Sequence, residues 1–460
     1  MKIISTLVYG VVLVLSIMSC NAQPAIAFKN PIVAIDMPSV IGYPDSSLIG
    51  LTKTTFLRKA GIKKALKEPN CRYIINHNFD LGGDTLVIGN NCLLEFKGGS
   101  IKNGVIVGNN TMILYSDKAI FKNIKIEGSW NVPNISTNMF ADSKKENVLK
   151  QLFNLTDNNV FNRVEIREGT YYVAALQDND AVLRPKSNTE IILDGNIQLR
   201  ANDFPYYQVM AIYGATNVYL HGKGCIIGDM FKHRYTMRYG ENRKTHEWGH
   251  GLTIRGCRNV LVEDITCKDC TGDACSITSQ IPSDISPVAV VGTPSLNITV
   301  KRCHFEGARR QGITIGYASY VAIDSCFFAN ISQAYKGTAP GAGIDIEPDN
   351  NGNKKIDRGC EVSYIIIEYC TFDNCIYGIQ TWRSHTADDV RNFHDMIIQD
   401  CHLSNIKKWA IGLTGYRNVQ IENCKIVNAK YGIRYDNSYN VHTENMLYDN
   451  VKSRTVGMPF

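Results

Sequence analysis

The second half of the chain repeats one pattern of apolar and polar positions. In each copy an aliphatic residue is followed three positions later by Cys. An apolar residue comes two positions after the Cys, and a small-apolar-x-apolar run follows. Both apolar runs alternate with a period of two, so we predict that each copy forms two short strands. The clearest copies are VKRCHFEGARRQGITIG (300–316), IEYCTFDNCIYGIQTW (367–382), IQDCHLSNIKKWAIGLT (398–414) and IENCKIVNAKYGIRYD (421–436).

Repeats of this size predict a stack of coils, because one coil cannot bury its own apolar face. Two further copies are less regular: 323–332 continues at 341–347 after an insertion, and 262–278 is looser. If each strand pairs in parallel with its equivalent one coil away, like residues form ladders inside the stack. The handedness of parallel crossovers then predicts a right-handed parallel β-helix, an all-β solenoid with short capping helices. The expected ladders are Cys303, Cys326, Cys370, Cys401 and Cys424, and beside them Phe305, Phe328, Phe372, Leu403 and Ile426.

The N-terminus resembles a bacterial export signal with a lipobox. Lys2 precedes an apolar run, and Ile17-Met18-Ser19-Cys20 would place a lipid on Cys20. We therefore expect an exported lipoprotein of a Gram-negative bacterium, outer-membrane or periplasmic, tethered to the membrane through Cys20. Cleavage after Ala22, which would release a soluble periplasmic protein, is the alternative. The membrane face stays open.

The rest of the chain divides into two sections. Residues 1–20 form the signal, 21–145 a cap with a degenerate β-helical section, and 146–460 the main β-helix. Short helices are expected at 57–66 and 146–155. Fourteen cysteines remain beyond Cys20, but five of them occupy one inward ladder, where Cys serves as a small apolar residue. The CxxC formed by Cys267 and Cys270 lies inside a repeat, so we expect no metal or redox site there.

Composition changes this picture little. The chain is 44% hydrophobic and 20% charged, with a formal net charge of +6. That mild excess of positive charge gives no reason to expect nucleic acid as a partner.

Three segments carry a family resemblance: VEIREGTYYV (164–173), NTEIILDGNIQLRAN (188–202) and TNVYLHGKGCIIGDMFKH (216–233). They resemble the opening of the pectate lyase and polygalacturonase superfamily of right-handed β-helices, and the resemblance extends over about 160–450. It implies an enzyme that cleaves polysaccharides by hydrolysis or β-elimination. It is specific for the fold and weak for the reaction.

Aligning the second strand of each repeat predicts one outward-facing polar wall. Asp345 and Glu347 are two positions apart on one strand, so their side chains emerge about 6.5–7 Å apart. Asp273 enters its strand two coils away, about 9.6 Å along the stack. Carboxylates at such separations suit glycoside hydrolysis, with one as acid and one as base. Like charges this close would also raise one pKa, which an acid catalyst needs.

The family resemblance adds weight to Asp273 and His250, which enter strands in GDACSI and GHGLTI as an Asp and a Gly-His-Gly do in polygalacturonases. The order along the chain differs, however, and Gln311 stands where a charged residue would be expected. The polygalacturonase mechanism therefore cannot be transferred whole.

The loop at 229–251 precedes this wall and is rich in cations and aromatic residues. In an exported β-helix such a loop suits acidic sugars, since Arg pairs with a carboxylate or sulfate and aromatic faces stack on sugar rings. Glu247 at its end is a further candidate acid, and His233 a candidate contact to substrate. A solvated charged loop is the alternative. The cations are Lys232, Arg234, Arg238, Arg243 and Lys244, and the aromatics Phe231, Tyr235, Tyr239 and Trp248.

Together these features predict a glycoside hydrolase acting on an acidic polysaccharide or oligosaccharide, with Asp273 and Asp345 as acid and base. Glu347 and Glu247 are the substitutes. A polysaccharide lyase is the second hypothesis, with Arg309, Arg310 or His250 in the chemistry, and a non-catalytic glycan-binding lipoprotein the third. No cofactor is expected for hydrolysis, and calcium only for a lyase. The residues expected to bind sugar are His233, His250, Arg309, Arg310, Gln311, Gln380 and Trp382.

Overall fold

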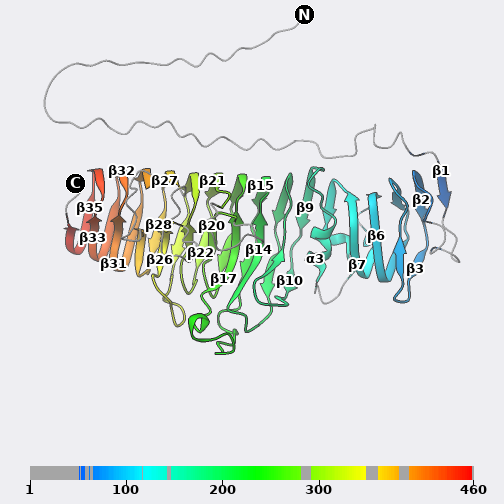
Figure 1. Ribbon diagram of the computed structural model, residues 1–460, viewed down its shortest axis with the longest axis horizontal. Helices are drawn as coiled ribbons and strands as arrows, with labels where there is room; N and C mark the ends of the chain where they lie inside the picture. Colours follow the sequence, from blue (N-terminus) through cyan, green and yellow to red (C-terminus); the bar gives the residue numbers. More distant parts are fainter. Residues whose placement is uncertain are drawn as a thin grey trace, which may run out of the picture.

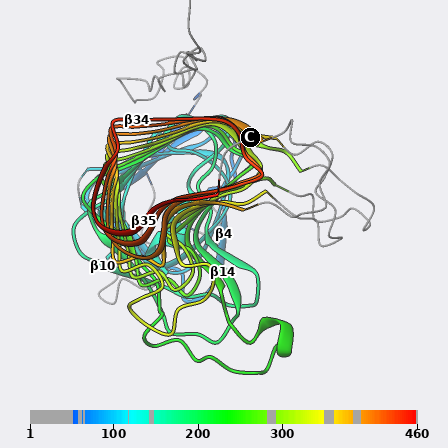
Figure 2. The same ribbon diagram turned by 90° about the vertical axis from the view of Figure 1, so that its left-hand side faces the viewer.

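The chain folds into a long stack of β-coils, shown side-on in Figure 1 and end-on in Figure 2. The computed structural model describes residues 51, 53–56, 62, 66–116, 118–141, 147–280, 292–348, 361–382 and 393–457. Within these ranges every pairing between strands is parallel, and strands pair with their equivalents one coil away. The prediction of a right-handed parallel β-helix is confirmed.

Three sheets run along the stack. The seven-stranded sheet contains β1 (Lys53–Phe56), β2 (Cys71–Ile75), β3 (Asn78–Asp80), β4 (Thr85–Val87), β5 (Leu93–Phe96), β6 (Ser100–Leu114) and β7 (Phe121–Asn131). The 11-stranded sheet contains β8 (Asn134–Ser136), β9 (Asn162–Ile166), β12 (Thr189–Leu193), β15 (Thr216–His221), β18 (Arg258–Glu263), β21 (Ser295–Lys301), β24 (Ala318–Asp324), β27 (Val362–Glu368), β30 (Phe393–Gln399), β32 (Arg417–Glu422) and β34 (Tyr439–Glu444).

The 17-stranded sheet carries the remaining strands and the candidate site. Its members are β10 (Thr170–Val173), β11 (Asp180–Leu183), β13 (Asn196–Leu199), β14 (Tyr206–Tyr213), β16 (Cys225–Ile227), β17 (Trp248–Arg255), β19 (Thr266–Lys268), β20 (Cys275–Thr278), β22 (His304–Glu306), β23 (Ile313–Ile315), β25 (Phe327–Ala329), β26 (Ala342–Ile346), β28 (Thr371–Asp373), β29 (Tyr377–Thr381), β31 (His402–Thr414), β33 (Lys425–Asp436) and β35 (Leu447–Val456).

Each coil contains three strand segments, not the two that the repeat suggested. The aliphatic residue ends a strand of the 11-stranded sheet, and the Cys follows a turn. The residue before each ladder Cys has a positive φ, for example 50° at Arg302 and 54° at Ser325. In an unbroken strand, residues three positions apart point to opposite faces. The turn made by this left-handed residue lets both the aliphatic residue and the Cys three positions later point into the core.

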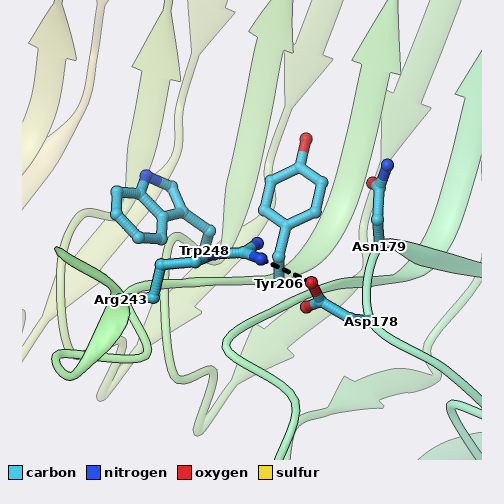
Figure 3. Close-up of a pocket in the computed structure, with 5 residues that line it drawn as sticks. All are labelled: Asp178, Asn179, Tyr206, Arg243 and Trp248. Atoms are coloured by element: carbon cyan, nitrogen blue, oxygen red, sulfur yellow. Dashed lines mark hydrogen bonds and ion pairs between the residues drawn. The ribbon is translucent and has the colours of Figure 1, made fainter. Parts of the chain in front are cut away.

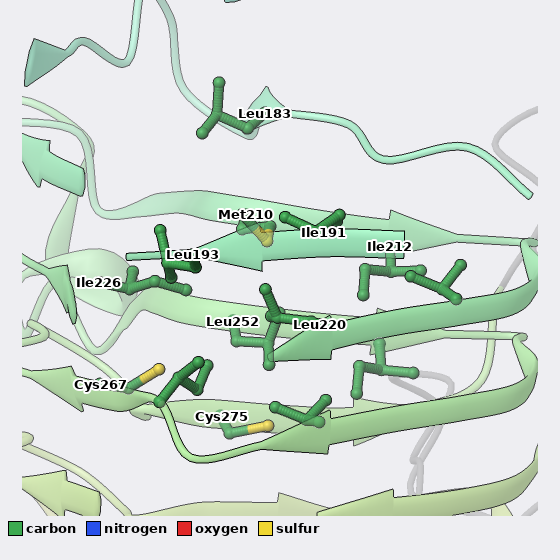
Figure 4. Packing of buried hydrophobic residues seen from close by; sticks show 14 of the residues in the cluster. Leu183, Ile191, Leu193, Met210, Ile212, Leu220, Ile226, Leu252, Cys267 and Cys275 are labelled. Atoms are coloured by element: carbon green, nitrogen blue, oxygen red, sulfur yellow. The ribbon is translucent and has the colours of Figure 1, made fainter. Parts of the chain in front are cut away.

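The predicted ladders are confirmed by the register. Phe305, Phe328 and Phe372 pair in turn across neighbouring coils and continue with Leu403 and Ile426. The rings of Phe328 and Phe372 stack with their centroids 4.7 Å apart. The small residue of each repeat is required by this ladder, since a Cβ on Gly312 would lie 2.6 Å from Phe328. Figure 4 shows the same layered packing further along the stack, where Met210, Leu252 and Cys275 fill successive coils.

The ladder cysteines are buried thiols. Each Sγ lies within hydrogen-bonding distance of a backbone carbonyl in the preceding coil, as Cys326 does with Val300 at 3.5 Å. All thirteen cysteines in the described ranges are unpaired. Cys20 and Cys360 lie outside those ranges.

Asparagine ladders line the turns outside the core. Asn188, Asn217, Asn259 and Asn297 all have positive φ, which Asn tolerates better than most residues. Their side-chain amides form a chain of hydrogen bonds from coil to coil, with distances of 2.9–3.1 Å. The ladders therefore hold the turns of successive coils in register.

Helical structure is sparse in the described ranges. The predicted helix at 146–155 is present as α3 (Val148–Asn154), and its buried face packs against β7 and the start of the main stack. Two 3₁₀ turns, η1 (Thr137–Met139) and η2 (Glu241–Arg243), complete the elements. The predicted helix at 57–66, like Cys20 and the signal, falls mostly or wholly outside the described ranges. Among the described helices, none combines the length and apolarity that a membrane span needs.

Candidate active site

The predicted outward columns occur in the structure with the predicted register. Thr253, Ser276, Thr314, Asp345 and Gln380 pair in sequence on neighbouring coils of the 17-stranded sheet. The residues entering these strands form a parallel column that includes Gln208, His250, Asp273 and Gln311. The sequence suggested a wall open to solvent, but all of these side chains are buried except Gln380, which is half-buried. Loops from 229–251 and 331–341 contribute the covering residues.

Hydrogen bonds join Asp273 to Asp345 across two coil spacings. Asp273 Oδ2 accepts from the Thr314 hydroxyl at 2.8 Å, and Thr314 also contacts Gln311 Oε1. Gln311 Nε2 donates to Asp345 Oδ2 at 2.6 Å. The two aspartates that the sequence singled out therefore belong to one buried polar network, on one face of the stack.

Arg310 links Asp273 to Glu347. Its Nη1 donates to both carboxylate oxygens of Asp273 at 3.2–3.3 Å, and its Nη2 donates to Glu347 at 3.1 Å. Burial opposes the charge on Arg310, but Asp273 and Glu347 raise its pKa, so the guanidinium stays charged. One cation thus holds carboxylates from two sides of the site.

Three of the candidate acids have raised pKa values. Burial is the main cause for Asp345, whose pKa lies well above its usual range, and the neighbouring charge of Glu347 adds to it. Burial also raises the pKa of Asp273, against the opposing effect of Arg310, and that of Glu247. The expectation that close carboxylates would raise one pKa is therefore met at Asp345.

His250 is a neutral imidazole next to Asp273. Burial lowers its pKa well below 6.5, and the positive charges of Arg255 and Arg310 lower it further. The backbone N–H of Asp273 donates to His250 Nδ1 at 3.1 Å, so the ring proton must be on Nε2. His250 can accordingly act as a hydrogen-bond donor through Nε2.

A cavity of about 440 Å³ opens beside this network. We call it the acid cavity, because Glu247, Asp345 and Glu347 line it. The inserted loop at 331–341 contributes Ala339 and Pro340 to its wall. The full lining is Glu247, Arg310, Ala339, Pro340, Asp345, Glu347, Tyr377, Gln380, Thr381, Trp382, Lys408, Trp409, Gly412, Thr414 and Arg434.

The predicted site residues separate into three groups. Glu247, Arg310, Asp345, Glu347, Gln380 and Trp382 all line the acid cavity. Asp273, His250 and Gln311 lie in the buried network and do not line it. His233 and Arg309, expected to bind sugar, lie elsewhere.

Arg309 is a structural cation that ties two loops together. Its Nη1 donates to the carbonyl of Thr245 at 2.9 Å, and its Nε donates to that of Lys336 at 3.1 Å. Its guanidinium also lies 4.3 Å from the centroid of the Tyr235 ring. Because backbone carbonyls and the Tyr235 ring already contact the guanidinium, Arg309 is placed to hold the loops and not the sugar.

His233 belongs to a buried chain that anchors the loop at 229–251. Its Nδ1 lies 2.9 Å from Asp229 Oδ2, and its Nε2 lies 2.7 Å from His246 Nδ1. His246 Nε2 faces the Thr236 carbonyl at 2.8 Å and must donate to it. His246 Nδ1 then accepts when that ring is neutral, so His233 donates from Nε2. The other ring nitrogen of His233 faces Asp229, so Asp229, His233 and His246 form one buried hydrogen-bonded chain.

Most of the loop cations are paired with carboxylates. Arg234 and Arg238 lie 3.8 and 3.6 Å from Asp203, Arg243 lies 2.5 Å from Asp178, and Lys244 lies 2.7 Å from Glu241. In the acid cavity Arg310 and Arg434 are also paired, the latter with Asp436 at 2.9 Å, but Lys408 pairs with no carboxylate among the described residues. The predicted anion-binding role of the loop is therefore better placed there.

The sequence did not single out nine of the cavity residues, and four of these form a group of stacked aromatic and cationic side chains. Tyr377 and Trp409 stack with centroids 5.1 Å apart, Lys408 lies over Tyr377 and Arg434 over Trp409. Tyr377, Trp409 and Tyr431 occupy the same position in three successive repeats. The recurrence of an aromatic residue at the entry of three successive strands was the signal that could have identified them.

One group of possible metal ligands lies away from the cavity, on the 11-stranded sheet. Glu422, His442 and Glu444 bring one ligand atom each within 4.8 Å of one another. His442 and Glu444 are exposed and lie 3.4 Å apart. Nothing else at this place indicates an ion, and we assign none.

Comparison with known proteins supports the fold and leaves the activity open. The family model described as "Right handed beta helix region" matches residues 231–388 and 288–457. The chain is 28% identical over 347 residues to the SPbeta prophage-derived uncharacterized protein YorA of Bacillus subtilis, covering 72% of this chain and 55% of that one. It therefore spans about half the length of this relative.

Two solved structures are similar to this chain at low sequence identity. One is a hyperthermoactive exopolygalacturonase from Thermotoga maritima, 13% identical, with a TM-score of 0.42 over 71% of this chain and 92% of that one. The other is the A-module of the mannuronan C-5 epimerase AlgE6 from Azotobacter vinelandii, 9% identical, with a TM-score of 0.44 over 71% and 96%.

Proposed function

We propose that this right-handed parallel β-helix of the pectate lyase and polygalacturonase type is a glycoside hydrolase that cleaves an acidic polysaccharide or oligosaccharide in the acid cavity. The proposal depends chiefly on one observation. Asp345 lines the cavity with a raised pKa, and its Oδ1 has no hydrogen-bond partner among the described residues. A carboxyl held neutral with one oxygen unsatisfied is suited to donate a proton to a leaving group.

The neighbouring contacts define which oxygen would carry the proton. Gln311 donates to Asp345 Oδ2, so that oxygen already accepts a hydrogen bond. The acidic proton then belongs on Oδ1, the oxygen without a partner. We assign Asp345 as general acid on this basis.

Glu347 is our choice for the base. It lines the same cavity two residues from Asp345, and Arg310 holds it at 3.1 Å. Glu247 is the substitute, although its raised pKa makes it the poorer base. Asp273, which does not line the cavity, becomes a positioning residue that orients Arg310. Sugar carboxylates would pair with Arg310, Lys408 or Arg434, and Trp382 and Gln380 would contact the sugar.

The test is a screen of the purified protein against plant and host polysaccharides, with reducing ends and ultraviolet-absorbing unsaturated products measured together. We expect new reducing ends without unsaturation, and at least a 100-fold loss in Asp345→Asn and Glu347→Gln. Unsaturated products would establish a lyase, for which calcium dependence should then be examined. Glycan binding without any product would establish a binding protein.

We also propose that the protein is exported and tethered through a lipid on Cys20, as its N-terminal sequence suggests. Cys20→Ser should move the protein from the membrane fraction to the soluble fraction of the cell. Unchanged membrane association would contradict this anchor.

A further inference from the structure

A second pocket of about 560 Å³ lies on the 17-stranded sheet, towards the N-terminal side of the acid cavity (Figure 3). We call it the aromatic pocket. Tyr206 begins β14 and Trp248 begins β17, and the two residues pair in register, so their rings come from neighbouring coils. Asp178 and Asn179 precede β11, and Arg243 comes from η2 in the loop at 229–251. These five residues form the lining.

The aromatic pocket offers a ligand no net charge. Its one cation and one anion, Arg243 and Asp178, form an ion pair at 2.5 Å, drawn as a dashed line in Figure 3. The acid cavity differs, since its Lys408 donates to the Tyr377 hydroxyl at 3.0 Å and pairs with no carboxylate among the described residues. An anionic sugar would find no uncompensated positive charge among the residues that line the aromatic pocket. A neutral sugar needs no charged partner there.

The polar groups of the aromatic pocket are unoccupied by the protein. The Tyr206 hydroxyl, the Trp248 indole N–H and the Asn179 side-chain amide have no hydrogen-bond partner among the residues the structure describes. Aromatic faces with polar groups at their edges match a sugar ring, whose C–H faces stack on aromatic rings and whose hydroxyls form a polar rim. The lining therefore combines both features that a neutral sugar requires.

The two cavities are neighbours on the stack. Glu247 lines the acid cavity and the next residue, Trp248, lines the aromatic pocket, so the end of the loop at 229–251 stands between them. Trp248 is on the coil of β17, three coil spacings from Asp345 on β26, or about 14 Å along the axis. A glycan chain of a few units lying along the sheet could reach both.

We propose that the aromatic pocket is a subsite for a neutral sugar unit of the same glycan whose acidic unit occupies the acid cavity. That this subsite binds part of the hydrolase's substrate rests on the proposed function. Its preference for a neutral sugar rests only on the residues that line the aromatic pocket. It follows that the substrate is a heteroglycan that contains both neutral and acidic units.

The test is titration of the full chain, carrying Asp345→Asn to prevent turnover, with neutral gluco-, manno- and galacto-oligosaccharides and separately with oligogalacturonate. We expect at least one neutral series to bind, with affinity falling about tenfold in Trp248→Ala and measurably in Asn179→Ala. Lys408→Ala should leave neutral binding within about twofold and weaken oligogalacturonate binding about tenfold. Asn179 is exposed, so its variant keeps the test valid if Trp248→Ala does not fold.

Three outcomes would overturn the subsite: no neutral series binds, neutral binding is unchanged in both Trp248→Ala and Asn179→Ala, or oligogalacturonate binding depends on Trp248. These results are separate from the fate of the proposed hydrolase. Cleavage that is lost in Asp345→Asn supports the hydrolase whatever the neutral titration gives, and neutral binding at Trp248 can be observed even if no polysaccharide is cleaved.

Discussion

The side-chain amide of Gln311 donates a hydrogen bond to Asp345 from the neighbouring coil, at 2.6 Å. This contact satisfies one carboxylate oxygen and leaves the other, Oδ1, without a partner in the described part of the chain. It therefore places the two oxygens of one carboxyl group in different environments.

Asp345→Asn should abolish activity and stabilise the fold. The folded-state pKa of Asp345 is raised above 3.8, so the folded protein binds more protons than the unfolded chain between 3.8 and that raised value. Stability is therefore lost as pH rises through this window, and a neutral Asn avoids the loss. We expect a higher melting temperature than wild type at pH 7, with a difference that shrinks towards pH 4. A melting temperature that is lower at pH 7, in a variant that keeps its circular dichroism spectrum, would contradict a neutral Asp345.

Arg310 and Asp273 should be energetically coupled. Removing Arg310 leaves a buried carboxylate without its cation, and removing Asp273 leaves a mostly buried guanidinium with only Glu347. We expect Arg310→Gln to lower the free energy of unfolding by about 3 kcal/mol, and the double variant with Asp273→Asn to cost clearly less than the sum of the two single changes. Additive effects in urea unfolding would show that the pair does not interact. Arg302→Gln, at an exposed pair with Asp264, is the matched control and should cost under about 1 kcal/mol.

Asp229 should control the order of the loop at 229–251. Asp229 accepts hydrogen bonds from Tyr207 and Asn202 and lies 2.9 Å from the ring of His233. Asp229→Asn cannot accept from all of these donors, so we expect faster proteolytic cleavage within 234–245 and a lower melting temperature. Asp203→Asn removes a carboxylate that serves only longer ion pairs to Arg234 and Arg238, and it should change the cleavage rate little. Equal cleavage of the two variants would argue against the buried chain as the anchor.

Reductant should leave the stability of the stack unchanged. The ladder thiols are buried and unpaired, and their role is to fill space and to contact carbonyls of the preceding coil. Melting temperatures with and without dithiothreitol should therefore agree. Cys326→Ala should be tolerated better than Cys326→Leu, because the buried turn that holds Cys326 has no room for a larger side chain. A large drop in melting temperature on adding dithiothreitol would instead reveal a disulfide that the described thiols do not form.

The sequence predicted the stack, the two ladders and the register of the outward columns. These features are local and repeat, so each copy confirms the others: Cys326 and Phe328 can be aligned with Cys303 and Phe305 without any knowledge of the fold. The sequence did not reveal the third strand segment of each coil. A left-handed residue such as Arg302 has no special identity in the chain, and only the backbone shows the turn that it makes.

By itself, then, the sequence determined which residues share a column, because a parallel β-helix converts equal positions in the repeat into neighbours in space. Only the tertiary structure decided which of them line a cavity. Arg309 and Arg310 are adjacent in the chain, yet Arg309 holds two loops together and Arg310 donates to Glu347 in the wall of the acid cavity. The difference comes from loops that fold back over the wall and have no repeat to predict them. Where they lie determines which side chains are covered, which remain open and which pKa values burial raises.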